Sequence, residues 1–352
     1  MGLPEIDINF KSLAQTLMKR SERGTVALVL KDTIGSLTNP VKLDSIEKIP
    51  KGLSEDNKEQ IKLALKGGYT TTKEVLVFII AKEGKVTEAF TPLMNCKWNY
   101  LAIPEIGEET EAVATWIKGL RDKKHKKVVA ILPNHKADHE GIINFTTDEI
   151  NTEKKKYSTA QYCSRIAGVL ATTPLSISAT YFVLPEVESI KFIEDADKAI
   201  DNGELILIND GEKCKIGRAV NSLTTIAEGK SEDWKKIKII SAMDMIYDDI
   251  RVEFENNYVS KYPNSYDYKC LFIVKVNAYF KELELENILN KGQNNAELNV
   301  TKQKLYIEKQ GIKTEKFSEI EIKEYNTGSK LFMGGKISIL DAMEDLYFDV
   351  EV

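Results

Sequence analysis

The chain has 352 residues, of which 42% are hydrophobic and 29% are charged, and its formal net charge is -5. This balance is typical of a globular protein and excludes disordered, collagen-like and fibrous classes. Because single hydrophobic cores seldom grow past roughly 250 to 300 residues, the length predicts two domains. The acidic balance gives no overall electrostatic reason to bind nucleic acid or an anionic membrane.

Local features of the sequence argue against further classes of protein. The basic runs at residues 121–127 (RDKKHKK) and 153–156 lack the interleaved aromatic residues that stack on bases, so we expect solvated faces beside helices. The longest apolar run, residues 75–81, is far shorter than the roughly twenty residues of a membrane helix. No signal peptide is visible at the N-terminus, which predicts a protein made inside the cell.

The cysteines form no CxxC pair, so neither a zinc site nor a disulfide framework is indicated. We expect four buried thiols, at Cys96, Cys163, Cys214 and Cys270.

The chain begins with an alternating segment, residues 5–10 (EIDINF), whose apolar side chains Ile6, Ile8 and Phe10 share one face. Strict alternation predicts a half-buried strand. A helical pattern over residues 11–23 follows and ends at Gly24. We therefore assign residues 1–23 to an N-terminal arm and helix that lie outside the first compact element.

From residue 24 to about residue 230, short apolar runs alternate with amphipathic stretches, which is typical of βα units around a mainly parallel sheet. The predicted strands are residues 25–30, 74–81, 100–103, 128–133 and 205–208, and the predicted helices are residues 54–66, 108–123 and 158–171. A turn at residues 209–211 (NDG) predicts a closing hairpin. This region is predicted to be an α/β domain.

Residues 231–340 change to an α+β pattern. Two long helices are predicted at residues 233–259 and 266–289, followed by strands at residues 296–307, 319–325 and 330–340. Residues 341–352 form a C-terminal strand arm, because residues 346–352 (LYFDVEV) alternate again with Leu346, Phe348, Val350 and Val352 on one face.

No constellation for catalysis is present in the sequence. It contains no GxxxxGK[ST], GxGxxG or GxSxG motif, and residues 67–73 (GGYTTTK) follow a helix, so they predict a helix stop. The metal-like cluster of His135, Asp138, His139 and Glu140 lies between Pro133 and Gly141, which predicts a solvated polar loop. We therefore expect no catalytic residue, no cofactor and no metal.

The predicted terminal strands are only marginally stable on their own. For residues 5–10, burial of three apolar side chains contributes about 6 kcal/mol, and four hydrogen bonds contribute about 4 kcal/mol. Ordering the backbone costs about 1 to 2 kcal/mol per residue, so the sum is near zero. Such an arm is stable only when a preformed sheet edge receives it, either in its own chain or in another copy by β-augmentation.

Five further stretches are informative together: GLPEIDINF at residues 2–10, RGTVALVLKD at 23–32, NYLAIPE at 99–105, GRAVNSLTT at 217–225 and DAMEDLYFDVEV at 341–352. In their order and spacing along the whole chain they resemble contractile phage tail sheath proteins, most closely those of PBSX-like defective phages and of clostridial R-type bacteriocins such as diffocins. The resemblance implies an outer α/β domain and an inner, tube-facing C-terminal domain, with no catalytic residues to carry over.

The resemblance also implies a hexameric ring subunit, stacked helically around a tail tube, that shifts from an extended to a contracted lattice and drives the tube through a cell envelope. Terminal arms of neighbouring subunits pair in this family with a sheet in the C-terminal domain of a third. The matching positions are Ile6, Ile8, Phe10, Phe348, Val350 and Val352. The acidic faces of both arms predict lysines such as Lys302 or Lys304 near that sheet.

The implied partners are other copies of the chain, a tail tube protein, and baseplate and terminator proteins at the sheath ends, with neither nucleic acid nor membrane. The implied location is a phage tail or bacteriocin particle released on lysis. Other hypotheses are the sheath of a related contractile secretion system, another self-assembling lattice protein, and an α/β enzyme with an unrecognised site.

Overall fold

A computed structural model describes residues 18, 23–33 and 39–351. The predicted strand at residues 5–10 lies outside these residues, as does nearly all of the predicted helix at residues 11–23. The chain divides into two compact units. The α/β unit comprises residues 22–245 together with the segment that starts at Asp341, and the second unit contains Ile246–Leu340.

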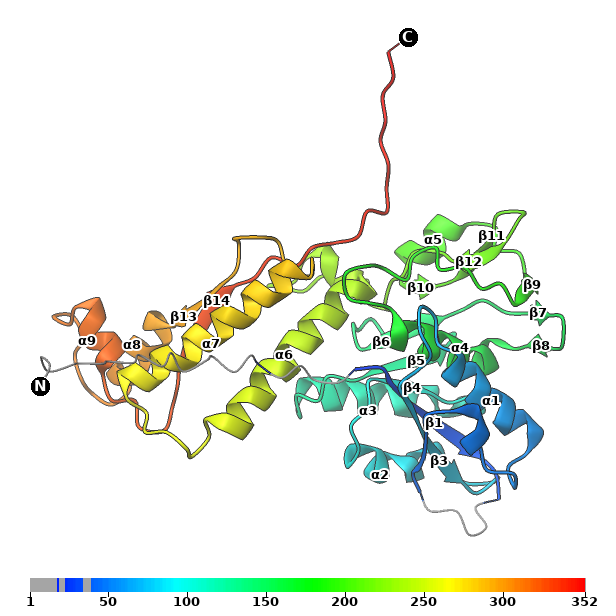
Figure 1. The fold of residues 1–352 in the computed structure, drawn as a ribbon, viewed down its shortest axis with the longest axis horizontal. Helices are drawn as coiled ribbons and strands as arrows, with labels where there is room; N and C mark the ends of the chain where they lie inside the picture. The colour runs from blue at the N-terminus through cyan, green and yellow to red at the C-terminus, as the bar shows by residue number, and fades with distance from the viewer. Residues whose placement is uncertain (1–17, 19–22, 34–38, 352) are drawn as a thin grey trace, which may run out of the picture. The chain divides into compact units, whose positions relative to one another are not determined.

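The α/β unit is built on a sheet with the strand order β10-β6-β5-β4-β1-β3-β2 (Figure 1). Its strands are β1 (Thr25–Lys31), β2 (Val41–Leu43), β3 (Glu74–Ile80), β4 (Tyr100–Ala102), β5 (Val129–Pro133), β6 (Ile142–Phe145) and β10 (Glu204–Leu205). All neighbours pair in parallel except β2, which runs antiparallel to β3. The structure thus confirms the prediction of a mainly parallel sheet.

Helices cover both faces of this sheet. Because successive side chains of a strand point to opposite faces, each strand contributes side chains to two separate buried clusters. Val26 and Leu28 of β1 join one buried cluster, while Ala27 and Val29 join the other. The first cluster contains residues of α1 (Glu55–Lys66) and α4 (Thr159–Thr172), and the second contains residues of α2 (Phe90–Met94) and α3 (Thr110–Asp122). The result is a three-layer arrangement.

Local capping sets the helix bounds near the predicted positions. The Ser54 side chain accepts a hydrogen bond from the backbone of Asn57 at the start of α1, and Gly67 ends the helix with a φ of 62°. Ser158 and Gln161 form a reciprocal capping box at the start of α4. The predicted helix stop at Gly67 is therefore confirmed.

The predicted closing hairpin is also present. Strands β11 (Leu207–Asn209) and β12 (Cys214–Ile216) pair antiparallel around a turn at Gly211. The single predicted strand at residues 205–208 is wrong, however, because the chain changes sheets at Ile206, whose carbonyl accepts from Gly217 N.

Shorter elements complete the α/β unit. The strands β7 (Ile150–Thr152), β8 (Lys156–Tyr157) and β9 (Val187–Ser189) form a separate small sheet, and the remaining helices are α5 (Ala196–Asp201), η1 (Ile46–Lys48), η2 (Val86–Ala89), η3 (Gly107–Glu109) and η4 (Glu232–Lys235).

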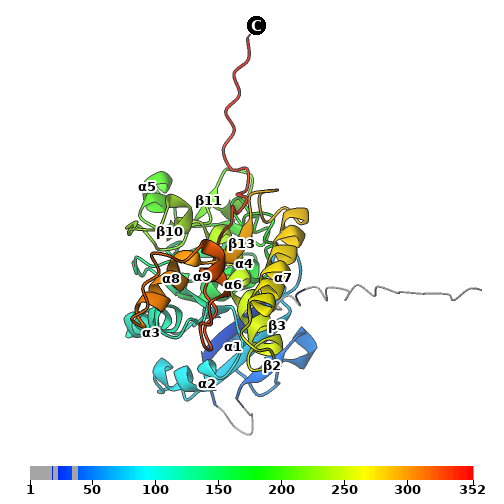
Figure 2. The same cartoon turned by 90° about the vertical axis from the view of Figure 1, so that its left-hand side faces the viewer.

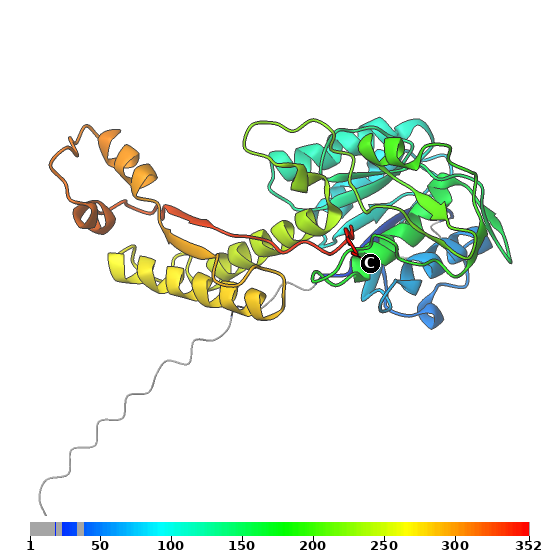
Figure 3. The same cartoon turned by 90° about the horizontal axis from the view of Figure 1, so that it is seen from above.

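The two long predicted helices are confirmed as α6 (Ile237–Asn257) and α7 (Tyr266–Leu285). Within the second unit, α7 contributes buried Phe272, Val276 and Leu283, and the hydroxyl of Tyr279 donates to Asp249 of α6 at 2.6 Å. The hairpin of β13 (Asn295–Leu298) and β14 (Met333–Lys336) lies alongside α7 (Figure 3).

Several strand predictions in this unit are wrong, because local capping favours helices. Residues 319–325 form α9 (Glu319–Glu324), which begins with a capping box between Ser318 and Glu321. Only the start of residues 296–307 is a strand, since the Asn299 side chain caps α8 (Val300–Glu308). The strand predicted at residues 330–340 shortens to β14, although Ile339 still bridges Leu289.

The cysteine prediction is confirmed for Cys163 and Cys214, which are buried, and is wrong for Cys96 and Cys270, which are half-buried. All four thiols are free. Among the residues that the structure describes, no helix has the length and apolar character of a membrane span.

Candidate assembly interface

The C-terminal residues expose an unusual run of large apolar side chains. Residues 341–351 form an extended segment with neither helix nor strand (Figure 2). Leu346, Phe348 and Val350 are 88%, 78% and 63% exposed. We call residues 346–351 the C-terminal arm. The strand predicted at residues 346–352 is thus not formed within the described chain, and Val352 lies outside the described residues.

The residues just before this arm, 341–345, are held on the α/β unit by charged groups, and we call them the arm base. Arg218 lies 2.5 Å from Asp345 (Nη2 to Oδ1) and 3.6 Å from Glu344 (Nε to Oε2). The hydroxyl of Thr180 donates to Glu344 at 2.7 Å. Lys236 pairs with Asp341. The arm base is therefore anchored, while among the described residues nothing covers the apolar side chains of the arm beyond it.

Sequence reasoning missed these anchoring residues. Arg218 lies inside GRAVNSLTT, one of the stretches that carried the resemblance, yet no motif or spacing connected it with Asp345. More than one hundred residues separate Arg218 from Asp345 in the sequence, so only the tertiary structure brings the two side chains together.

The β13–β14 hairpin of the second unit is a candidate receiving surface. It is a two-stranded sheet among the described residues, and such a sheet is marginally stable without further strands or packing. The strands approach closely, since a Cβ at Gly335 would lie 2.2 Å from the carbonyl oxygen of Asn295. Glycine is therefore required at this position of β14.

A second exposed apolar feature lies on α7. Tyr268, Leu271 and Val274 are 38%, 45% and 48% exposed and follow one another at intervals of three residues. Residues at this spacing share one face of a helix, so they form a continuous stripe.

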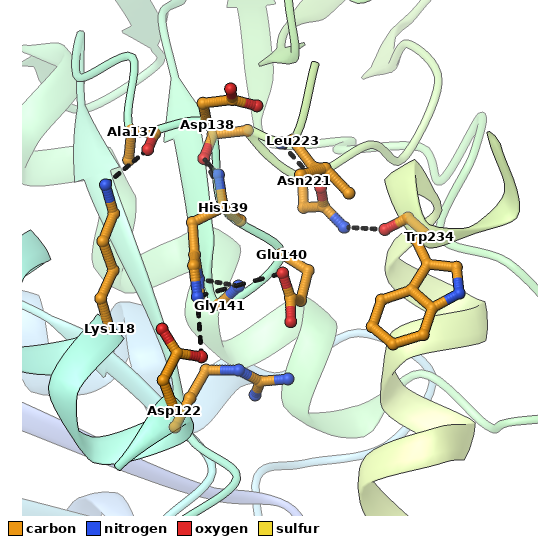
Figure 4. A network of polar contacts seen from close by, with 12 residues as sticks. Lys118, Asp122, Ala137, Asp138, His139, Glu140, Gly141, Asn221, Leu223 and Trp234 are labelled. Carbon is orange, nitrogen blue, oxygen red and sulfur yellow. Dashed lines mark hydrogen bonds and ion pairs between the residues drawn. The ribbon is translucent and has the colours of Figure 1, made fainter. Parts of the chain in front are cut away.

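Asp138, His139 and Glu140 of the metal-like cluster lie in a network of polar contacts (Figure 4). The Asp138 carboxylate accepts hydrogen bonds from the backbone amides of Thr224 and Thr225 at 2.7 and 2.8 Å. Glu140 pairs with Lys230 at 3.0 Å. These contacts tie the loop after β5 to residues 224–230.

His139 sits at the centre of this network. Its Nδ1 accepts from the backbone amide of Gly141 at 2.9 Å, and its Nε2 lies 3.4 Å from Asp122. Burial lowers the pKa of His139 from its ordinary value. The prediction of a solvated loop is wrong for His139 and Glu140, which are both buried. Within the described ranges, no three His, Cys, Asp or Glu side chains are grouped to hold a metal ion.

The basic run at residues 121–127 is also not simply solvated. Arg121 is buried and donates to both carboxylate oxygens of Asp244. The ammonium of Lys126 donates to the main-chain oxygens of Leu93, Met94 and Cys96. The solvated-face prediction is wrong for these two residues, because Arg121 pairs with a buried carboxylate and Lys126 donates hydrogen bonds to main-chain carbonyls. Residues 122–125 are exposed, as expected.

Comparison with solved structures shows that this fold is similar to that of sheath proteins. A sheath tail protein from Listeria innocua matches with a TM-score of 0.68 at 18% identity, over 81% of this chain and 90% of that one. The helical sheath of the anti-feeding prophage in its contracted state matches with a TM-score of 0.70 at 11% identity, over 100% of this chain and 99% of that one. At these identities the likeness concerns the fold alone.

Sequence comparison provides evidence for the family as well as for the fold. The phage tail sheath protein central domain matches residues 81–222, and the phage tail sheath C-terminal domain matches residues 229–352. The tail sheath protein of Clostridium phage phiCD119 is 39% identical over 100% of this chain and 99% of its own length. XkdK of the phage-like element PBSX of Bacillus subtilis is 25% identical over 45% of this chain and 35% of its length. The chain belongs to the phage tail sheath family, a family of structural proteins of contractile tails.

Proposed function

We propose that this chain is the repeating subunit of a contractile sheath, polymerises as stacked hexameric rings around a tail tube, and contracts to drive the tube through a cell envelope. Membership of the tail sheath family supports this role. The role is structural and non-catalytic. It requires strong contacts between copies that survive a change of lattice.

The observation that carries the proposal is the exposure of the C-terminal arm. A soluble protein seldom presents Leu346, Tyr347, Phe348 and Val350 together to water, and contiguous exposed apolar side chains mark interaction sites. An extended segment also needs partners for its backbone amides and carbonyls. Pairing with a sheet edge in another copy satisfies both needs at once.

In this proposal the subunit interface consists of Phe348, Val350 and Val352 at one end and Ile6, Ile8 and Phe10 at the other. Residues 24–230 form the outer domain, residues 231–340 form the assembly domain, and residues 1–23 and 341–352 provide the arms. The β13–β14 hairpin is the sheet of the assembly domain available to receive arms. Flexible arms keep neighbouring subunits connected while their compact domains rotate.

The other proposed partners are a tail tube protein inside the sheath and baseplate and terminator proteins at its ends. The protein is made in the bacterial cytoplasm and leaves it on lysis as part of a phage tail or bacteriocin particle. A second candidate is the sheath of a related contractile secretion system, favoured by the match to the anti-feeding prophage sheath over 100% of this chain. A neighbouring reading frame for a small tube protein would separate a sheath from an unrelated self-assembling lattice protein.

Negative-stain electron microscopy of the purified protein tests the proposal, and striated hollow cylinders are expected. The double variant Phe348→Ser with Val350→Ser should stay folded and lose the cylinders, because both side chains are exposed in the single chain. Phe192→Ser is the matched control, since Phe192 is 83% exposed and lies outside the arm. Persistent monomers of the unmodified protein would contradict the proposal.

Removal of residues 2–10 tests the other arm separately. We expect a folded monomer that no longer polymerises, measured by circular dichroism and by microscopy. Cylinders formed by the truncated protein would show that the N-terminal arm is not needed. A broad hydrolase screen of the same preparation addresses the enzyme hypothesis.

A further inference from the structure

A polar pocket that the proposed arm contacts do not involve lies in the α/β unit. It opens at the carboxyl ends of β5, β6 and β10, which are parallel neighbours at one side of the sheet, and α5 contributes to its wall. Its volume is about 540 Å³, within the range of roughly 300 to 1,000 Å³ that is typical of small-molecule sites. Open α/β sheets bind ligands outside the carboxyl ends of their strands. The pocket therefore has the position and the size of a ligand site.

Asn144 of β6 supplies an unused donor in the wall of this pocket. Its side chain is buried, and its Oδ1 accepts a hydrogen bond from the backbone amide of His135 at 2.6 Å. Because a backbone amide only donates, this contact fixes which end of the Asn144 side chain is the oxygen. The other end, Nδ2, is also buried and has no hydrogen-bond partner among the described residues. A buried donor without a partner is costly, and an oxygen atom of a ligand in the pocket would satisfy it.

The charged side chains that line the pocket balance one another. Lys136 and Glu204 form an ion pair at 3.4 Å. Lys191 and Asp148 also line the pocket, and Lys191 is exposed with no ion pair to the part of the chain that the structure describes. Two positive and two negative groups give the pocket no net attraction for an anion or a cation. A ligand hydroxyl, in contrast, donates to a carboxylate and accepts from an ammonium or an amide, so it suits every one of these groups.

An aromatic ring lies beside these polar groups. Phe192 lines the pocket and is 83% exposed, more than any other aromatic side chain that the structure describes outside residues 341–351. The backbone amide of Lys191 donates to the carbonyl of Asp148 at 3.0 Å, which holds this loop near the end of β6. A single exposed phenylalanine is ordinary on a protein surface. Next to a polar pocket, however, its flat apolar face complements a ligand that has hydroxyl groups at its edge and C–H groups on its face, as a sugar ring has.

We propose that this pocket binds an uncharged sugar unit of hexose size. The sugar hydroxyls bond to Asn144 Nδ2 and to the charged side chains, while the face of the ring packs on Phe192. This inference goes beyond the sheath role, because the pocket lies within the α/β unit and involves neither arm. A free monosaccharide and the terminal unit of a surface glycan share this chemistry. Either would give the proposed outer domain an affinity for carbohydrate in addition to its part in the sheath.

Saturation-transfer difference NMR on the full chain tests the proposal, with D-glucose, D-galactose, D-mannose and N-acetyl-D-glucosamine as probes. Acetate, an anion, and adenosine, a nucleoside, serve as comparison ligands. Titration of each bound probe gives its dissociation constant. The disaccharide of the tightest-binding monosaccharide then distinguishes the two sources, since tighter binding of the disaccharide indicates a glycan and equal binding indicates a free sugar.

Two variants remove separate parts of the site. Phe192→Ser removes the ring at an exposed position, so the fold should stay intact. Asn144→Asp keeps an oxygen that accepts from His135 N and replaces the unused donor with an acceptor. The double variant Phe348→Ser with Val350→Ser is the matched control, because it also removes an exposed phenylalanine, but from the C-terminal arm. Circular dichroism checks that each variant is folded.

We expect saturation transfer to at least one of the sugars, and a dissociation constant about tenfold larger for each pocket variant, which corresponds to the loss of one aromatic contact or one hydrogen bond. The arm double variant should bind the sugar as tightly as the unmodified protein. No transfer to any of the sugars, unchanged affinity in Phe192→Ser, or tighter binding of acetate or adenosine would overturn the sugar site. If Asn144→Asp does not fold, Phe192→Ser alone decides.

Cylinder formation is a separate readout of the same proteins. Phe192→Ser should form cylinders and lose sugar affinity, whereas the arm double variant should keep sugar affinity and lose the cylinders. Loss of the sugar site would therefore leave the sheath role intact, and a failure of the unmodified protein to form cylinders would leave the sugar site to be decided by the titrations.

Discussion

The guanidinium of Arg121 donates to both carboxylate oxygens of Asp244, at 2.8 and 2.9 Å, where the two side chains are only 3% and 4% exposed. The pair joins α3 to the first turns of α6 within the α/β unit. The Arg121 guanidinium also donates a hydrogen bond to the carbonyl oxygen of Val128. Gly141 lies against the same side chain, since a Cβ there would be 2.2 Å from Arg121 Cδ.

Asp244→Ala should therefore destabilise the protein by about 3 to 5 kcal/mol, because it leaves a buried guanidinium without its counter-charge. Urea unfolding, followed by circular dichroism, measures this change. Asp44→Ala is the control, since Asp44 forms an exposed pair with Lys48. Equal unfolding midpoints for the two variants would contradict the role assigned to the buried pair.

Replacing each of two helical glycines with alanine should change the stability of the protein in opposite directions. A Cβ at Gly168 of α4 would lie 2.5 Å from the carbonyl oxygen of Ala64 of α1, whereas a Cβ at Gly119 of α3 would meet nothing within 4 Å. Gly168→Ala should destabilise by about 1 to 3 kcal/mol through overpacking. Gly119→Ala should stabilise by about 0.5 to 1 kcal/mol through helix propensity. Thermal unfolding of both variants checks the signs, and a stabilised Gly168→Ala would refute the close helix contact.

His139 predicts a stability loss in mild acid. Burial lowers its pKa, although the carboxylates of Asp122 and Glu140 act in the opposite direction, and Arg121 lowers it further. Below the ordinary histidine pKa of about 6.5, the unfolded chain binds a proton that the folded chain still excludes. The free energy of unfolding should therefore fall as pH decreases through this value, until the folded-state pKa is reached.

The measurement is the unfolding free energy of the unmodified protein and of His139→Gln between pH 7.5 and about 5. The variant should show a smaller fall over this interval, because it lacks the titrating group. Asp138 has a pKa held low by the Thr224 and Thr225 hydrogen bonds, despite its desolvation, and titrates well below this window. Parallel curves for the two proteins would exclude His139 as the origin of the acid sensitivity.

The ion pairs that hold the arm base predict that the yield of polymer depends on salt concentration. Arg218→Gln removes both contacts to Glu344 and Asp345 and should loosen residues 344–345 without unfolding the α/β unit, while Thr180 and Lys236 still hold the start of the arm base. Hydrogen exchange of this segment should accelerate, and polymer yield should decrease and depend less on salt, because part-exposed ion pairs are screened. Lys48→Gln serves as an exposed control. Unchanged exchange in Arg218→Gln would show that the arm base is held in another way.

Much of the α/β unit could be predicted from the sequence, because its signals are local. Long apolar runs such as residues 74–80 identify strands, and Ser54 with Gly67 identifies both ends of a helix. The short strands β6 to β9 were missed, since two to four residues carry too little periodicity. Residues 319–324 were misread as a strand because the alternation of EIEI also suits a short capped helix.

The sequence by itself determined the family, through similarities spread over the whole chain, and the apolar faces of the two arms, through strict alternation. It could not tell which residues hold the arm base or which side chain pairs with the backbone of β13. Those features depend on contacts such as Arg218 with Asp345 and Asn277 with Ala296, which join distant or differently structured segments. Local patterns encode which face of an element is apolar, whereas only the folded chain brings a guanidinium to its carboxylate and a side-chain amide to a strand edge.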